Sequence, residues 1–199
     1  MTQQEKISYI IGRDMATNLK KQGIEIEAES FAKGLKEVLA GQPSSLSPQE
    51  VQQAMMALQQ EMTQKQGAKG AENQQAGEAF LAENKNKEGV KTLPSGLQYQ
   101  VLQEGSGKSP AKTDKVTTHY HGTLIDGTVF DSSYERGQPA TFSVNGVIAG
   151  WTEALQLMKE GAKWRLFIPS NLAYGSQGAG DAIGPNSTLI FDVELISVH

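Results

Sequence analysis

The spacing of the hydrophobic residues changes once along this chain, close to residue 90. Before that point apolar residues recur every three or four positions, which places them on one face of a helix. After it they alternate, as Leu189, Phe191 and Val193 do, which places them on one face of a β-strand. One short helical segment, WTEALQLM at residues 151–158, interrupts the alternating part. We therefore predict an α+β domain, an antiparallel sheet wrapped around one short helix, preceded by an all-α N-terminal arm.

Turn-forming and capping residues divide the helical arm. Gly23 and Gly41 each follow an apolar stripe and are placed to end the first and second helices. Ser47, Pro48 and Glu50 have the spacing of a capping box with proline at the first helical position, so a third helix is expected to begin there. We expect this third helix to continue to about residue 87 as a long connecting helix.

The long helix loses its apolar stripe after Met62, and its later part is polar on all sides and contains Gly67 and Gly70. A helix that is polar all round can bridge two domains through solvent, and glycine favours a bend. We expect both features here. The predicted domains are a helical dimerisation domain at residues 1–45, the connecting helix at 46–87 and the α+β domain at 88–199.

Three amphipathic stripes in a helical piece of about 60 residues are marginally stable on their own. We therefore predict that the N-terminal helices form a homodimer. The alternative is that the same stripes pack on the C-terminal domain of their own chain.

Composition excludes several classes of protein. The chain has 199 residues and no cysteine, so it has no disulfide, no thiolate nucleophile and no cysteine-ligated zinc. A net charge of −4 argues against nucleic acid as a partner. No apolar run reaches bilayer length, so no membrane insertion is expected. The N-terminus, MTQQEKISYII, lacks the features of a signal peptide, which indicates the cytoplasm; the periplasm or cell envelope remains the alternative if a signal peptide has been removed.

Motifs for metal, phosphate and covalent chemistry are incomplete. GSGKS at residues 105–109 lacks the earlier glycine of a phosphate loop and is followed by Pro110, which cannot sit well inside a helix. His119 and His121 share a strand face, but the only other histidine is His199, so a solvated strand face is expected rather than a metal site. No hydrolase triad is recognisable. We expect neither a metal nor a cofactor.

One stretch, GTVFDSSYERG at residues 127–137, combines an aromatic residue with charges: Phe130 precedes Asp131, and Arg136 follows five positions later. On a regular strand Phe130 and Asp131 would point to opposite faces, whereas a bulge or bend would let both line one cavity. The later segment VNGVIAGWTEAL surrounds a helix N-terminus with apolar side chains, where unpaired N–H groups can meet a carbonyl.

Three segments follow one another in residues 93–199: VTTHYHGTLIDGTVFDSSYERGQPATFSVNGVIAGWTEAL, then AYG, then NSTLIFDVELI. In these segments and in their order, residues 93–199 resemble the FKBP-type peptidyl-prolyl isomerases. The helical half and the junction GEAFLAENKNKEGVKTLPSGLQY resemble the two-domain bacterial subgroup of the macrophage infectivity potentiator (Mip) type.

The resemblance implies an apolar, aromatic pocket with few polar groups. Trp151 would form its floor, and Asp131 would face the pocket, held by Arg136 and Tyr120. The Tyr174 hydroxyl and the Ile148 N–H would donate to carbonyls of the substrate. By this resemblance the catalytic residues are Asp131, Tyr174, Trp151, Phe130 and Tyr120, and the substrate-binding residues are Val147, Ile148, Arg136, Phe142, Ile183 and Phe191.

The implied activity is faster rotation about X–Pro bonds in unfolded or partly folded proteins, by a non-covalent mechanism in a dimeric folding helper. The implied partners are proline-containing unfolded clients, macrolide inhibitors of the FK506 and rapamycin type, and a second copy of the chain. One alternative is a holdase chaperone that clasps clients with its two arms, with isomerisation secondary. Another is a pocket that only docks a partner.

Overall fold

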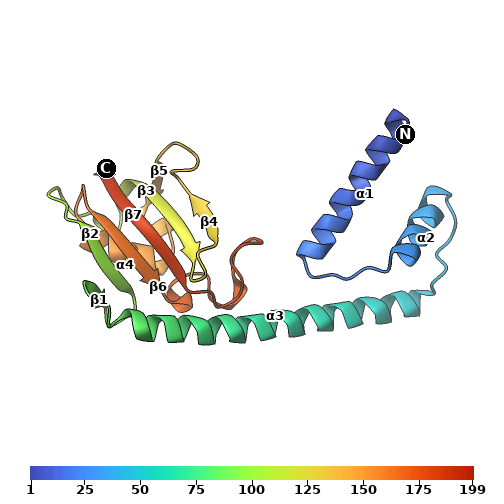
Figure 1. Ribbon diagram of the computed structural model, residues 1–199, viewed down its shortest axis with the longest axis horizontal. Helices are drawn as coiled ribbons and strands as arrows, with labels where there is room; N and C mark the ends of the chain where they lie inside the picture. The colour runs from blue at the N-terminus through green and yellow to red at the C-terminus, as the bar shows by residue number, and fades with distance from the viewer. The chain divides into compact units, whose positions relative to one another are not determined.

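The computed structural model describes residues 1–199, which divide into two compact units, residues 1–66 and 67–199 (Figure 1). The first unit contains α1 (Gln3–Lys21), α2 (Ala28–Leu39) and the first part of α3 (Pro48–Asn84). The second unit contains the rest of α3 and the α+β domain. The predicted fold class is confirmed, and none of the helices combines the length and hydropathy needed to cross a membrane.

The helix boundaries in the first unit follow the predicted local signals. Gly23 and Gly41 have φ values of 73° and 63°, in the left-handed region that lets glycine end a helix. At the start of α3 the Ser47 N–H donates to Glu50 Oε2 at 2.8 Å, and the Glu50 N–H donates to Ser47 Oγ at 3.3 Å. The predicted capping box is therefore confirmed, and it fixes where the long helix begins.

The apolar stripes of the first unit remain exposed. No residue of α1 or α2 is buried, and the side chains at the end of α2 are among the most exposed, with Val38 and Leu39 at 77% and 78%. The exposed set continues onto α3 with Val51, Met55 and Met56. Within the first unit, the helices therefore do not bury the apolar faces that define them.

The second unit contains a seven-stranded antiparallel sheet with one helix against it (Figure 1). The strands are β1 (Val90–Thr92), β2 (Gln98–Gln103), β3 (Lys115–Leu124), β4 (Val129–Ser132), β5 (Ala140–Ser143), β6 (Lys163–Ile168) and β7 (Leu189–Val198). Their order is β1-β2-β6-β7-β3-β4, and β5 pairs with β3. The helix is α4 (Ala149–Leu157), and its buried face and the alternating inward residues of β3, β6 and β7 form the core.

The register between β3 and β4 contains a bulge. His121 pairs with Ser132 and Gly122 with Asp131, but the next residue, Thr123, pairs with Val129. Phe130 is thus the extra residue on β4. A bulge bends the strand and redirects side chains, which answers the question left open by the sequence: Phe130 and Asp131 can face the same cavity.

The polarity of the second part of α3 predicted a helix that bridges two domains through solvent. In the structure this part instead packs against the α+β domain. The Phe80 ring lies 6.0 Å from the Phe167 ring of β6, and the buried Asn84 donates to Gln98 Oε1 at 3.0 Å. The helix is continuous from Pro48 to Asn84 and includes both Gly67 and Gly70. Gly77 is itself buried, because without a side chain it allows the helix to approach the start of β7 closely.

Candidate active site

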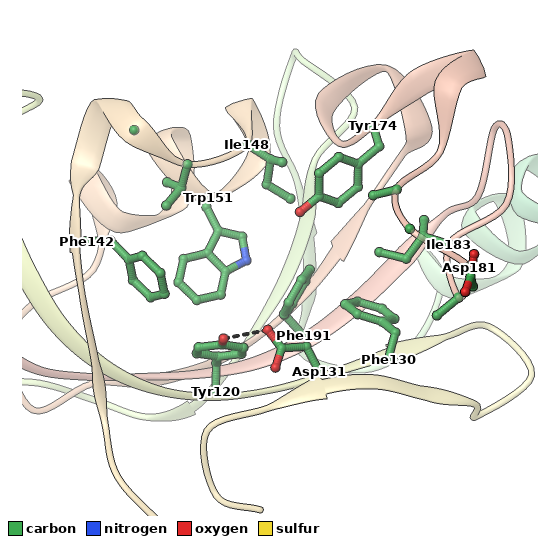
Figure 2. A pocket seen from close by; sticks show the side chains of 15 residues that line it. Tyr120, Phe130, Asp131, Phe142, Ile148, Trp151, Tyr174, Asp181, Ile183 and Phe191 are labelled. Atoms are coloured by element: carbon green, nitrogen blue, oxygen red, sulfur yellow. Dashed lines mark hydrogen bonds between the residues drawn. The ribbon is translucent and has the colours of Figure 1, made fainter. Parts of the chain in front are cut away.

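A cavity of about 690 Å³ opens between α4, the strands β3, β4, β5 and β7, and the loop after β6 (Figure 2). Every residue that the resemblance assigned to the pocket lines it except Arg136. Most of the lining is aromatic or aliphatic, as expected for a site that binds an apolar group. The volume is sufficient for a proline ring and the residues on either side of it.

Trp151 forms the centre of the aromatic lining. It lies in the first turn of α4 and is 4% exposed. Its ring meets three others edge to face: Tyr120 at 5.4 Å, Phe142 at 5.8 Å and Phe191 at 5.3 Å. Such edge-to-face contacts are favourable arrangements of aromatic rings, so the floor of the cavity is a packed aromatic cluster. Gly122 beneath Phe130 and Phe191 leaves room for this arrangement.

The indole Nε1 of Trp151 is buried and has no hydrogen-bond partner in the chain. Figure 2 shows this nitrogen on the side of the ring that faces the cavity. A carbonyl oxygen of a bound peptide could accept a hydrogen bond from this N–H. Only the presence of a tryptophan at position 151 pointed to this donor before the structure was known.

Asp131 is held at the edge of the cavity by Tyr120 and Arg136. The Tyr120 hydroxyl donates to Asp131 Oδ2 at 2.6 Å, and Arg136 Nη2 donates to the Tyr120 oxygen at 2.6 Å. Arg136 Nη1 also pairs with Asp131 Oδ1. Burial is the main cause that raises the pKa of Tyr120, and the hydrogen bond to Asp131 adds to it. The hydrogen bonds that Arg136 makes to Tyr120 and Asp131 raise the pKa of Arg136. The phenol therefore stays protonated and orients the carboxylate.

A buried serine that sequence reasoning missed fixes the segment carrying Asp131. Ser133 is fully buried; its hydroxyl accepts the Tyr120 N–H at 2.7 Å and lies 2.9 Å from His119 Nδ1. His119 stacks on the ring of Tyr134 at 4.6 Å. His119 is therefore partly buried in packing and hydrogen bonding, rather than on a solvated strand face. The hydrogen-bonding capacity of serine was visible in the sequence, but its partners were not.

The opposite wall comes from Tyr174 and the loop that follows it. Tyr174 is 41% exposed, and Figure 2 shows its hydroxyl pointing into the cavity. Ile148 is the N-cap residue of α4, where helical N–H groups lack partners within the helix. Ile183 is 8% exposed and pairs with Ala179 through a short antiparallel bridge. The pocket residues that sequence reasoning missed here are Gly146, Ala179, Gly180, Asp181 and Ala182.

The cavity offers an apolar surface, a fixed carboxylate and several hydrogen-bond donors, and no nucleophile is activated by a neighbouring base. Such a set can bind a peptide and favour one geometry of its backbone. These features are those of a site for conformational catalysis.

Comparisons with known proteins place the chain in a family. Residues 106–196 match the family described as FKBP-type peptidyl-prolyl cis-trans isomerase, and residues 4–101 match the domain amino terminal to it. The chain is 48% identical to the outer membrane protein MIP of Legionella longbeachae, over 99% of this chain and 86% of that protein. It is also 48% identical to the peptidyl-prolyl cis-trans isomerase Mip of Coxiella burnetii, over 99% and 87%.

Among solved structures, FkpA from Escherichia coli is similar over 99% of this chain and 97% of that one, with a TM-score of 0.73 and 40% identity. The chain therefore belongs to the FKBP-type peptidyl-prolyl cis-trans isomerases and is an enzyme of that class. The resemblance to the two-domain Mip subgroup is also confirmed, because the helical half matches together with the catalytic half.

Proposed function

We propose that the cavity over Trp151 is where this isomerase rotates X–Pro bonds of unfolded or partly folded proteins. The observation that carries the proposal is the carboxylate of Asp131, fixed by Tyr120 and Arg136 at the edge of an aromatic cavity. In this assignment the proline ring packs on Trp151, and Tyr174 and the Ile148 N–H donate to the flanking carbonyls.

The proposed mechanism lowers a barrier without making or breaking a bond. Amide resonance sets a barrier of about 18–20 kcal/mol for rotation about the X–Pro bond. The planar amide is more charge-separated than the twisted one, so a cavity that replaces water with aromatic surface favours twisting. Donors that hold the flanking carbonyls in the twisted geometry would add to this preference. Asp131 acts here by its field and position and transfers no proton.

The test is the exchange rate between cis and trans forms of a short Leu-Pro or Phe-Pro peptide, measured by NMR exchange with catalytic amounts of protein. We expect strong acceleration by the full chain and a loss of about tenfold or more in kcat/KM in Asp131→Ala. Glu135→Ala is the matched control, since it removes a carboxylate four residues away that does not line the cavity. Equal turnover in Asp131→Ala and the wild type would exclude the proposed role of Asp131.

We further propose that the chain works as a homodimer joined by its N-terminal helices. The exposed apolar faces of α1 and α2 support this, because monomeric proteins rarely expose such continuous apolar surface. Two pockets in one dimer would raise the effective concentration of a site near any client that is already bound. Macrolides of the FK506 and rapamycin type are proposed inhibitors, because they would occupy the same apolar cavity.

The same exposed helices support a second candidate function, a holdase that binds clients whether or not it isomerises them. The two functions separate in Asp131→Ala: a holdase would still suppress aggregation of a refolding protein, while slow proline-limited refolding would no longer be accelerated. For location we propose the cell envelope rather than the cytoplasm indicated by the N-terminus, because a relative that is 48% identical is named an outer membrane protein.

A further inference from the structure

The second part of α3 contacts a glycine-rich loop that belongs to the catalytic domain. The loop, GSQGAGDAIGPNS at residues 175–187, connects Tyr174 to β7. Asn73 Nδ2 on α3 donates to the carbonyl of Pro185 at 2.9 Å and lies 3.4 Å from Ser187 Oγ. In return, Asn186 Nδ2 donates to the carbonyl of Gly70 at 3.3 Å. The helix and the loop are therefore joined by reciprocal amide hydrogen bonds.

This loop is one wall of the catalytic cavity. Residues 179–183 line the cavity directly. Backbone hydrogen bonds close the loop on itself, from the Ala179 N–H to the Ile183 carbonyl at 2.8 Å and from the Asn186 N–H to the Gly175 carbonyl at 2.8 Å. The second of these bonds ties the residue that contacts α3 to the residue that follows Tyr174. A displacement of Asn186 at its contact with α3 would thus move both Gly175, next to Tyr174, and the loop residues that line the cavity.

The loop has little intrinsic reason to hold one conformation. It contains four glycines, each of which loses more conformational entropy on ordering than any other residue. Asn186 has a φ of 56°, in the left-handed region that asparagine adopts more readily than most residues other than glycine. The hydrogen bonds from Asn186 to Gly70 and from Asn73 to Pro185 hold this part of the loop against α3.

Gly77 explains how the helix comes close enough to make these bonds. A Cβ atom added at Gly77 would clash with Thr188 Oγ1, just after the loop. The same addition at Gly67 would meet nothing within 4 Å. The surface of α3 therefore has a notch at Gly77, where the missing side chain makes room for Thr188. At Gly67, ten residues earlier, a side chain would meet no neighbour.

From these contacts we infer that α3 is a working part of the isomerase site, with Asn73 as a positioning residue for the cavity wall formed by residues 179–183. The inference rests on the proposed function of the cavity. Asn73 does not reach the substrate; it orders the loop that places Ile183 and Tyr174 around it. The segment that connects the two halves of the chain thereby also determines how well the catalytic cavity is formed.

The test compares Asn73→Ala with Gln74→Ala in the full-length protein. Gln74 is exposed, and its side chain bonds only Glu78 on the same helix at 3.0 Å. In Asn73→Ala we expect faster amide hydrogen exchange in residues 175–187 and a fall of about three- to tenfold in kcat/KM for a Leu-Pro peptide. The lower kcat/KM should come mainly from a higher KM, because the loop shapes substrate binding while the Asp131 carboxylate keeps its hydrogen-bond partners. Gln74→Ala should match the wild type in both measurements.

A second set of three variants tests the close approach of the helix at Gly77. Gly77→Ala should reproduce the faster loop exchange and the higher KM, whereas Gly67→Ala should leave both unchanged. Adding Thr188→Ala to Gly77→Ala should restore part of the lost kcat/KM, because it removes the closest clashing atom. Unchanged loop exchange in Asn73→Ala would overturn the inference, and so would faster loop exchange with unchanged kinetics. If the wild-type chain fails to accelerate exchange in the Leu-Pro peptide while Asn73→Ala still alters loop exchange, the proposed function of the cavity fails and the helix contact is only structural.

Discussion

Tyr120 contributes to both the polar and the apolar part of the site, so a variant at this position can test the two contributions separately. Its hydroxyl joins the carboxylate of Asp131 to the guanidinium of Arg136 through two bonds of 2.6 Å, while its ring meets Trp151 edge to face. Tyr120→Phe keeps the ring and removes only the hydroxyl. The change should therefore leave the cavity wall in place and free the carboxylate to rotate.

The size of the effect follows from how exposed the partners are. A hydrogen bond to a charged group contributes about 1.5–3 kcal/mol when it is shielded from water. The Arg136 and Asp131 side chains are 45% and 42% exposed and still pair with each other, so water replaces much of what the phenol supplied. We expect a loss of about 1 kcal/mol in the free energy of unfolding. If the orientation of the carboxylate matters for rotation, kcat/KM should fall by about tenfold.

Two measurements on the same variant separate these effects: urea unfolding and NMR exchange of a Leu-Pro peptide. Tyr134→Phe is the control, since it removes a phenol that also donates to a carboxylate, Glu194 at 2.8 Å, but does not line the cavity. At neutral pH this control should lose a similar amount of stability and keep its activity. A fully active Tyr120→Phe variant would refute the view that a fixed carboxylate contributes to catalysis.

Three further predictions test the cavity, the titration of a tyrosine and the assembly. Gly122→Ala would place a Cβ atom 2.6 Å from Phe130 and 2.7 Å from Phe191, so it should cost about 1–3 kcal/mol in urea unfolding and lower kcat/KM. Burial and the Glu194 carboxylate raise the pKa of Tyr134 to about 12; the stability it contributes should be complete below pH 10 and lost between pH 10 and 12. Unfolding midpoints of Tyr134→Phe should therefore fall less over that window. Sedimentation at micromolar concentration should give a dimer, and a monomer would contradict the proposed role of the N-terminal helices.

Alternation and capping signals were sufficient to predict the fold, because each depends on neighbours along the chain. The capping box of Ser47 and Glu50 and the alternating burial of β7 are local properties that tertiary contacts did not override. The orientation of Phe130 and Asp131, in contrast, could not be predicted from their neighbours along the chain. It depends on which residue of β3 pairs with Val129, and that register is fixed only when the sheet forms.

The docking surface of α3 was missed for a different reason. Its contact residues are Gly70, Asn73, Gly77, Phe80 and Asn84, which recur at alternating intervals of three and four, the spacing of one helix face. Four of the five are glycine or asparagine, so a search for hydrophobic periodicity finds a helix that is polar on every side. Each glycine also counts as a cost of about 1 kcal/mol when the helix is considered alone. In the folded domain the small size of the glycines and the amide groups of the asparagines make the contact, so this face is defined by shape and hydrogen bonding rather than by hydrophobicity.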